Sequence, residues 1–120
     1  MKIEVHHQDR RSDSKPASFV HVATVDAPAH LELWQALEYA WRWTNNVEGS
    51  WSIKERLLDG RDNGDFNEHV EVIAPLHVDE NGKRWGHRSS MMGDIFVADG
   101  KRYVVATFGF EEVTSEIAKP

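Results

Sequence analysis

The strongest constraint on the fold is a hairpin signal near the C-terminus. Two apolar runs, Ile95–Val97 and Tyr103–Phe108, flank the pair Asp99-Gly100. Asp-Gly fits the two-residue turns whose backbone twist matches that of paired strands, because both turn positions favour a positive φ angle. The pattern therefore predicts an antiparallel strand pair, and it is the best hairpin signal in the chain.

The N-terminal part of the chain predicts two more strands. Met1–His7 alternates the apolar Ile3 and Val5 with polar residues, which is the period-two pattern of a half-buried strand. Phe19–Val25 is rich in β-branched residues and suits a strand that pairs antiparallel with the first. The polar stretch Gln8–Ala17 between them is expected to be a mobile hairpin loop.

A helix of about four turns is predicted over His30–Thr44. Before it, Asp26-Ala27-Pro28 offers a capping side chain and a proline suited to a first turn. After it, Asn45-Asn46 is a plausible stop, because asparagine tolerates the left-handed conformation that ends helices. Apolar side chains recur on one face, so the helix should lie across the sheet. That face is centred on Leu33, Leu37, Ala40, Trp41 and Thr44, with Trp34 and Trp43 at its edges.

A second, short helix is predicted over Ser52–Leu58. Ser52 and Glu55 match the capping box, in which each side chain accepts a backbone N–H of the other residue, and Gly60 supplies a left-handed stop. Residues 59–68 are rich in glycine and carboxamides and are expected to form a loop. Val70–Ile73 then predicts a third strand, which Pro75 ends or leaves at a sheet edge.

These elements define an α+β domain: an antiparallel sheet of about five strands packed on one main helix, with a second short helix. At 120 residues, the chain has room for a single domain over residues 1–120. It contains no cysteine, which excludes disulfide and thiolate chemistry, and its N-terminus lacks the apolar centre of a signal peptide. We expect a cytoplasmic protein with no membrane segment and no cofactor.

The charge is segregated along the sequence. Between Asp59 and Glu80 lie seven acids and one base, Arg61, so this stretch carries the whole formal net charge of −6. A solvated face that keeps a small domain soluble is one interpretation, and an acidic surface that binds a basic protein partner is the other. The acids concerned are Asp59, Asp62, Asp65, Glu68, Glu71, Asp79 and Glu80.

A basic and aromatic stretch follows, from Lys83 to Tyr103. Bases near aromatic rings could contact phosphates and stack bases, which makes nucleic-acid binding the alternative interpretation. The net acidity of the chain argues against it. Trp34 and Trp41 are assigned to the core, so Trp43, Trp51 and Trp85 are the candidates for an exposed aromatic contact. The residues of the alternative surface are Arg84, Trp85, Arg88, Lys101 and Arg102.

Catalytic and metal chemistry find little support in the sequence. Residues 59–70 approach a calcium loop, but Arg61 stands where the third ligand belongs and Val70 replaces the last one. Of seven histidines, His6, His7 and His21 would be neighbours if the first strands pair, yet no carboxylate at ligand spacing accompanies them. We therefore expect no metal site.

A nucleophilic site is also not expected. A base and two hydroxyls lie close in sequence at His87, Ser89 and Ser90. The sequence indicates no third group that would orient one of them for nucleophilic attack. Asp94 is interpreted as structural, at the tight entry to the following strand. The chain is therefore predicted not to be an enzyme.

The C-terminal quarter resembles YodL-like domains, which are small modules in proteins of bacterial plasmids, phages and integrative elements. The resemblance lies in Arg88–Ile95, Asp99-Gly100, Tyr103–Val105 and Gly109-Phe110, while Met91-Met92 departs from the small or β-branched residues of that pattern. The family brings no catalytic residues, so the resemblance implies a genetic context. Together with the charge, it predicts a non-enzymatic accessory protein that binds a protein partner stoichiometrically, for example an inhibitor of a host defence complex such as a CRISPR effector.

Overall fold

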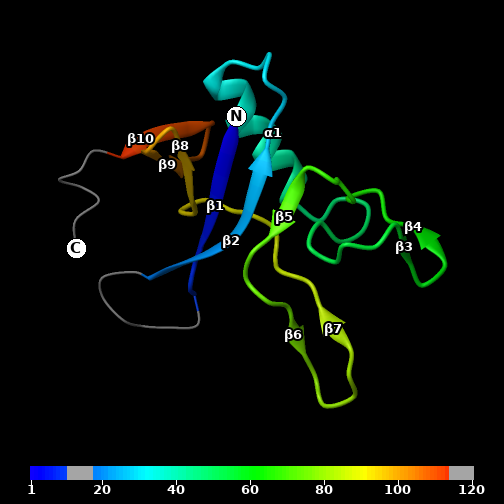
Figure 1. Cartoon of the computed structure of the whole chain (residues 1–120). Coiled ribbons are helices and arrows are strands. Elements are labelled where there is room, and N and C mark those ends of the chain that lie inside the picture. Colours follow the sequence, from blue (N-terminus) through cyan, green and yellow to red (C-terminus); the bar gives the residue numbers. More distant parts are fainter. Residues whose placement is uncertain (11–17, 114–120) are drawn as a thin grey trace.

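The centre of the molecule is a six-stranded sheet in which every strand runs antiparallel to its neighbours (Figure 1). The computed structural model describes residues 1–10 and 18–113, so most of the predicted loop over residues 8–17 lies outside the described part. The spatial order is β10-β9-β8-β1-β2-β5. The strands are β1 (Lys2–Gln8), β2 (Phe19–Asp26), β5 (Val70–Val72), β8 (Ile95–Ala98), β9 (Lys101–Val105) and β10 (Phe110–Val113).

Local sequence signals account for most of this sheet. The alternation in β1 buries Ile3 and Val5 completely, and β1 pairs antiparallel with β2 as predicted. The predicted hairpin joins β8 to β9 through Asp99 and Gly100, whose φ angles are 51° and 75°. Such angles are those that an Asp-Gly turn supplies at little cost. The antiparallel sheet of the predicted α+β fold is therefore confirmed, with six strands in place of about five.

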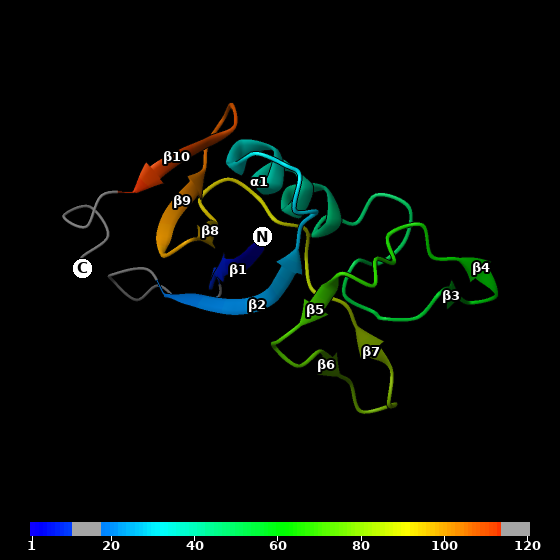
Figure 2. The same cartoon turned by 45° about the horizontal axis from the view of Figure 1, so that its top comes forward.

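In the part of the chain that the structure describes, one helix, α1 (Leu33–Trp43), accompanies the sheet (Figure 2). It begins later than predicted because Glu32 caps it: the Glu32 N–H donates to Gln35 Oε1 at 2.9 Å. At its end, the Thr44 hydroxyl donates to the Ala40 carbonyl oxygen at 2.7 Å. The assignment of Trp34 to the core is wrong, since this side chain is 57% exposed. The buried helix residues Ala36, Leu37 and Ala40 share one apolar cluster with Ile3, Val5, Val25 and Phe96 of the sheet.

The predicted second helix over Ser52–Leu58 is absent. Instead of capping a helix, Ser52 Oγ accepts a hydrogen bond from the His87 N–H at 2.7 Å, and the Glu55 carboxylate forms an ion pair with Arg84. Leu57 is 56% exposed, so it does not supply the tertiary packing that stabilises a short helix. Strand β3 (Leu57–Leu58) pairs with β4 (Arg61–Asp62), which also gives part of the predicted loop a regular structure.

A second small hairpin is formed by β6 (His77–Val78) and β7 (Arg84–Trp85). Both small hairpins project from the side of the molecule away from β9 and β10, as the two views show (Figures 1 and 2). Among the described residues, no helix is both long and apolar enough to cross a membrane. Each small hairpin is a separate two-stranded sheet and adds no strand to the main sheet.

Candidate protein-binding surface

Two buried polar side chains fix the backbone around the β3–β4 hairpin. The Asp65 carboxylate accepts hydrogen bonds from the N–H groups of Val47 and Glu48 at 2.8 and 2.9 Å, and it pairs with the Arg42 guanidinium at 3.2 Å. The Asn63 amide nitrogen donates to the carbonyl oxygens of residues 50, 53 and 55. These bonds replace regular secondary structure as the constraint on this loop-rich segment.

The buried position of Asp65 corrects one prediction. Its side chain is fully buried, so it does not belong to an exposed acidic surface. Two carboxamides of the calcium-like pattern bind other groups of the protein. Asn63 binds backbone groups of its own chain, and Asn67 donates to the Tyr39 hydroxyl at 2.9 Å. The acidic and carboxamide-rich stretch is thus partly a scaffold.

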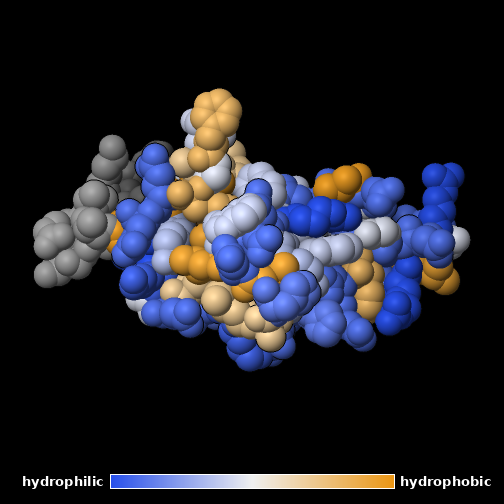
Figure 3. All heavy atoms as spheres, turned by 90° about the horizontal axis from the view of Figure 1, so that it is seen from above, coloured by the Kyte–Doolittle hydropathy of each residue, from blue (hydrophilic) through white to orange (hydrophobic). Residues whose placement is uncertain are grey.

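The remaining acids of the predicted set lie at the surface. The β3–β4 hairpin turns at Asp59 and Gly60, whose φ angles are 51° and 80°, and it exposes Asp59 and Asp62. On the same hairpin, the Leu57 side chain is about half exposed. At this end of the molecule, Figure 3 shows separate hydrophobic spots among hydrophilic residues. The other exposed acids are Glu68, Glu71 and Glu80.

The β6–β7 hairpin is organised around Asp79, which is partly exposed. Asp79 Oδ1 accepts the N–H groups of Asn81 and Lys83, both at 2.9 Å, and Asp79 Oδ2 accepts the Trp85 indole N–H at 3.0 Å. The Trp85 hydrogen bond, followed by the Lys83 N–H, holds the pKa of Asp79 below its ordinary value. The Lys83 ammonium lies 4.3 Å from the Trp85 ring centroid. Trp85 is thereby held in place while it stays 50% exposed.

We call the exposed residues of these hairpins the two-hairpin surface. The hairpins are tied together, since Arg84 of β7 forms an ion pair with Glu55, just before β3. The surface combines exposed apolar side chains with acids and bases. Its apolar and charged members are Leu57, Asp59, Arg61, Asp62, Val78, the partly exposed Asp79, Glu80, Lys83, Arg84 and Trp85.

The structure does not bring the predicted basic and aromatic residues together. Arg84 and Trp85 lie on β7, whereas Lys101 and Arg102 lie on β9, on the opposite side of the molecule in both ribbon views (Figures 1 and 2). Tyr103 is buried, so its ring is not available for stacking on a base. The nucleic-acid alternative thus has no single surface in the described structure.

Arg88, the remaining basic residue of that set, forms an ion pair with the fully buried Asp94, while its own side chain is 34% exposed. Its guanidinium donates two hydrogen bonds of 2.8 Å to Asp94, which also accepts the N–H groups of Gln8 and Met91. Burial opposes ionisation of Asp94, but Arg88 and these N–H groups outweigh it and hold the pKa of Asp94 below its ordinary value. Asp94 thus joins the end of β1 to the entry of β8, in agreement with the structural role predicted for it.

A chain of buried polar groups lies beside this ion pair. His7 Nε2 is 2.9 Å from Ser90 Oγ, which is 2.8 Å from Thr44 Oγ1. The nearest Asp94 oxygen faces the same His7 nitrogen, at 3.9 Å. In a nucleophilic triad the acid and the hydroxyl face opposite ring nitrogens, so this arrangement does not orient a base toward a nucleophile. Ser89 Oγ accepts the Asn46 N–H.

Burial is the main cause that lowers the pKa of His7 to about 4. His7 and Arg88 also border a cavity of about 600 Å³ between the end of β1, the start of β2 and the β6–β7 hairpin, with Trp85 and His87 in its wall. His87 uses its Nε2 to bind the Ala74 carbonyl oxygen at 2.8 Å. The polar groups named here are thus paired with other groups of the protein.

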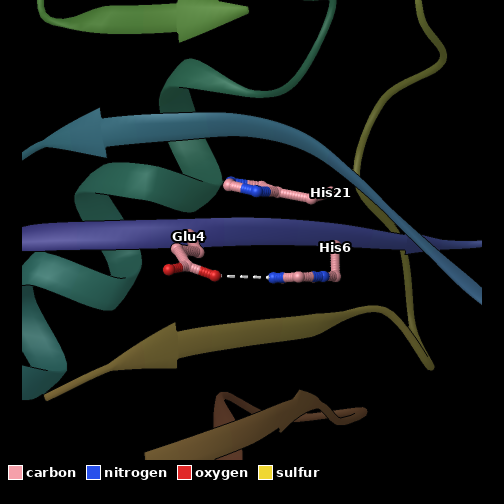
Figure 4. Close-up of side chains that lie close together, drawn as sticks. All are labelled: Glu4, His6 and His21. Carbon is pink, nitrogen blue, oxygen red and sulfur yellow. Dashed lines mark hydrogen bonds and ion pairs between the residues drawn. The ribbon is translucent and has the colours of Figure 1, made fainter. Parts of the chain in front are cut away.

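Two further predictions change with the structure. Trp51 is completely buried and donates its indole N–H to the Arg88 carbonyl oxygen at 3.0 Å, so it is not an exposed aromatic contact. Among the described residues, one group of three could hold a metal ion, namely Glu4, His6 and His21 (Figure 4). The sequence pattern indicates His6 and His21 as neighbours, but the carboxylate of Glu4 was missed.

No family model, curated protein or solved structure matches this chain. The resemblance to YodL-like domains stays a prediction.

Proposed function

We propose that this chain is a non-enzymatic protein that binds a protein partner stoichiometrically through the two-hairpin surface. The observation that carries the proposal is the exposure of Leu57, Val78 and Trp85 on hairpins that add no strand to the main sheet. Exposed large apolar side chains that lie among polar residues occur at interaction sites. Tryptophan is among the residues that contribute most binding energy at such sites.

The surrounding charge defines the chemistry of the partner. Asp59, Asp62 and Glu80 are exposed around the apolar side chains, and Glu68 and Glu71 extend the acidic area toward β5. A complementary partner presents basic residues around an apolar recess. The acids would accelerate encounter with such a partner and reject acidic surfaces.

The biological setting is proposed from the C-terminal quarter. Its resemblance to YodL-like domains supports an accessory protein of a bacterial plasmid, phage or integrative element. An inhibitor that occupies the nucleic-acid-binding surface of a host defence complex, such as a CRISPR effector, fits an acidic surface, because that part of a defence complex is basic. We place the protein in the cytoplasm on the same grounds.

A pair of tryptophan variants tests the proposal. Trp85→Ala and Trp34→Ala remove side chains of nearly equal exposure, 50% and 57%, and each indole donates a hydrogen bond to a nearby carboxylate. The immobilised wild-type chain is used to isolate a partner from a bacterial lysate, and the dissociation constant of the purified pair is measured. Trp85→Ala should weaken binding at least about tenfold, as expected at a hot spot, while Trp34→Ala should not.

Two results would contradict the proposal. Equal affinities of wild type and Trp85→Ala would remove the two-hairpin surface as the binding site. Retention of nucleic acid alone, released by salt in the same way from wild type and Trp85→Ala, would favour the nucleic-acid alternative.

A further inference from the structure

A second feature lies on the main sheet, on the face of β1 opposite its buried core residues. Residues alternate between the two faces of a strand. Ile3, Val5 and His7 are buried on one face, so Glu4 and His6 point to the other. The side chains of Glu4 and His6 are 47% and 24% exposed, which leaves this position accessible to solvent.

A β-bulge adds His21 to the same face. In the pairing of β1 with β2, Val5 lies opposite Ala23, as Glu4 lies opposite Thr24. The next residue, His6, lies opposite His21, so Val22 has no partner in β1 and is the extra residue of the bulge. Val22 and Ala23 are both buried as a result, in place of the regular alternation. Without the extra residue, His21 would point to the core. Bulges redirect side chains in this way and are frequent next to functional sites.

The three side chains meet closely at this point (Figure 4). His6 Nε2 is 2.9 Å from Glu4 Oε1, and His21 Nε2 is 3.0 Å from Thr24 Oγ1. The imidazole rings of His6 and His21 stack with their centroids 4.7 Å apart and their planes 13° from parallel. One ligand atom from each of Glu4, His6 and His21 lies within 4.8 Å of the other two.

We propose that Glu4, His6 and His21 form a binding site for a divalent transition-metal ion of the Zn²⁺ type. Two imidazoles and one carboxylate are a donor set that Zn²⁺ and its late first-row neighbours prefer, whereas Mg²⁺ and Ca²⁺ favour sites built from oxygen ligands. Three protein ligands leave further coordination positions for water or for a group of another molecule.

Metal binding requires a small rearrangement. Two nearly parallel rings do not aim their lone pairs at one point, so one imidazole must turn about its Cβ–Cγ bond. This torsion is broad in histidine, which makes the turn inexpensive.

Isothermal titration of the tag-free chain with Zn²⁺ tests the site. We expect one ion per chain, with affinity at least about tenfold lower in Glu4→Gln, His6→Gln and His21→Gln, since each variant removes a ligand. His69→Gln is the matched control, because His69 is exposed and lies beside Glu68 at 3.9 Å without belonging to the group. Circular dichroism establishes that each variant is folded.

Nuclear magnetic resonance gives an independent result. Zn²⁺ should change the chemical shifts of the ring nitrogens of His6 and His21 but not those of His69 and His77. Excess Mg²⁺ should not reverse these changes. Unchanged affinity in all three ligand variants would overturn the proposal, because binding would then occur at other histidines. Absence of saturable Zn²⁺ binding below about 1 mM would overturn it as well.

Discussion

The Trp85 indole donates a hydrogen bond of 3.0 Å to Asp79 Oδ2. This bond joins a residue of the predicted acidic surface to a residue of the alternative basic and aromatic surface. The same Asp79 side chain orders the turn between β6 and β7, so the position of Trp85 depends on the fold of its hairpin. A fixed aromatic side chain loses less entropy on binding than a mobile one, which favours Trp85 as the centre of the interface.

The first prediction concerns the acidity of Asp79. Trp85→Phe keeps an aromatic ring but removes the indole donor, which is the main cause that lowers the pKa of Asp79. The pKa of Asp79 should therefore rise toward its ordinary value, as measured by a carboxylate nuclear magnetic resonance titration. Glu80, the next residue, serves as the internal reference. A pKa of Asp79 that does not move would show that the hydrogen bond is absent in solution.

The second prediction concerns stability at acid pH. The pKa of His7 is lowered from 6.5 to about 4 in the folded chain. Between these values the unfolded chain takes up a proton at His7 and the folded chain does not, so stability decreases as pH falls through this window. The contribution, complete above pH 6.5, reaches up to about 3 kcal/mol and is lost near pH 4.

Urea unfolding of wild type and His7→Gln across that window measures this contribution. The glutamine can still bind Ser90 but does not titrate, so the difference between the two free energies of unfolding should change with pH. His69→Gln, at an exposed position, should follow the wild type. A difference that is constant from pH 6.5 to 4 would contradict the assignment of a neutral, buried His7.

The third prediction concerns the buried ion pair. Asp94→Asn puts an amide donor in front of the Arg88 guanidinium and of the Gln8 and Met91 N–H groups, which all need an acceptor. Loss of one partner from a buried pair should lower the free energy of unfolding by about 3 kcal/mol. Asp99→Asn in the exposed β8–β9 turn should change it by less than about 0.5 kcal/mol. Similar effects of the two substitutions would contradict the structural role of Asp94.

The fourth prediction separates scaffold from surface within the acidic stretch. Asp65→Asn disturbs the acceptor for the Val47 and Glu48 N–H groups and the pair with Arg42, so it should destabilise the fold by about 2 kcal/mol. Asp62→Asn, at an exposed position, should leave the thermal unfolding temperature unchanged. Calorimetry distinguishes the two residues, and equal unfolding temperatures would contradict the division.

The parts of the fold that could be predicted from the sequence are those with local causes. The alternation around Ile3 and Val5 predicts β1, and Asp99-Gly100 predicts the β8–β9 hairpin, because both patterns act over a few residues. The capping-box pattern at Ser52 and Glu55 is equally local, but the helix that it predicts is wrong. Each of its two side chains is taken by a distant group, His87 N–H and Arg84 respectively.

The candidate sites were harder to predict because they depend on tertiary contacts. No local signal distinguishes the buried Asp65 from the exposed Asp62, since the difference lies in Arg42 and in backbone groups 17 and 18 residues away. Strand alternation could have placed Glu4 beside His6. The bulge that turns His21 to the same face changes the register by one residue, and the sequence carries no clear sign of it.

The affinity of a charge-reversed chain for its isolated partner tests whether the exposed acids on and beside the two hairpins bind that partner. Asp62→Lys, Glu68→Lys and Glu80→Lys combined reverse exposed acids on or beside the hairpins, and Glu38→Lys, Glu111→Lys and Glu112→Lys reverse the same number of exposed acids elsewhere. The net charge of the two variants is identical, so a non-specific charge effect is cancelled. We expect at least about a tenfold loss of affinity in the hairpin variant alone, and added salt should make this loss smaller. Equal losses in both variants, or none in either, would contradict it.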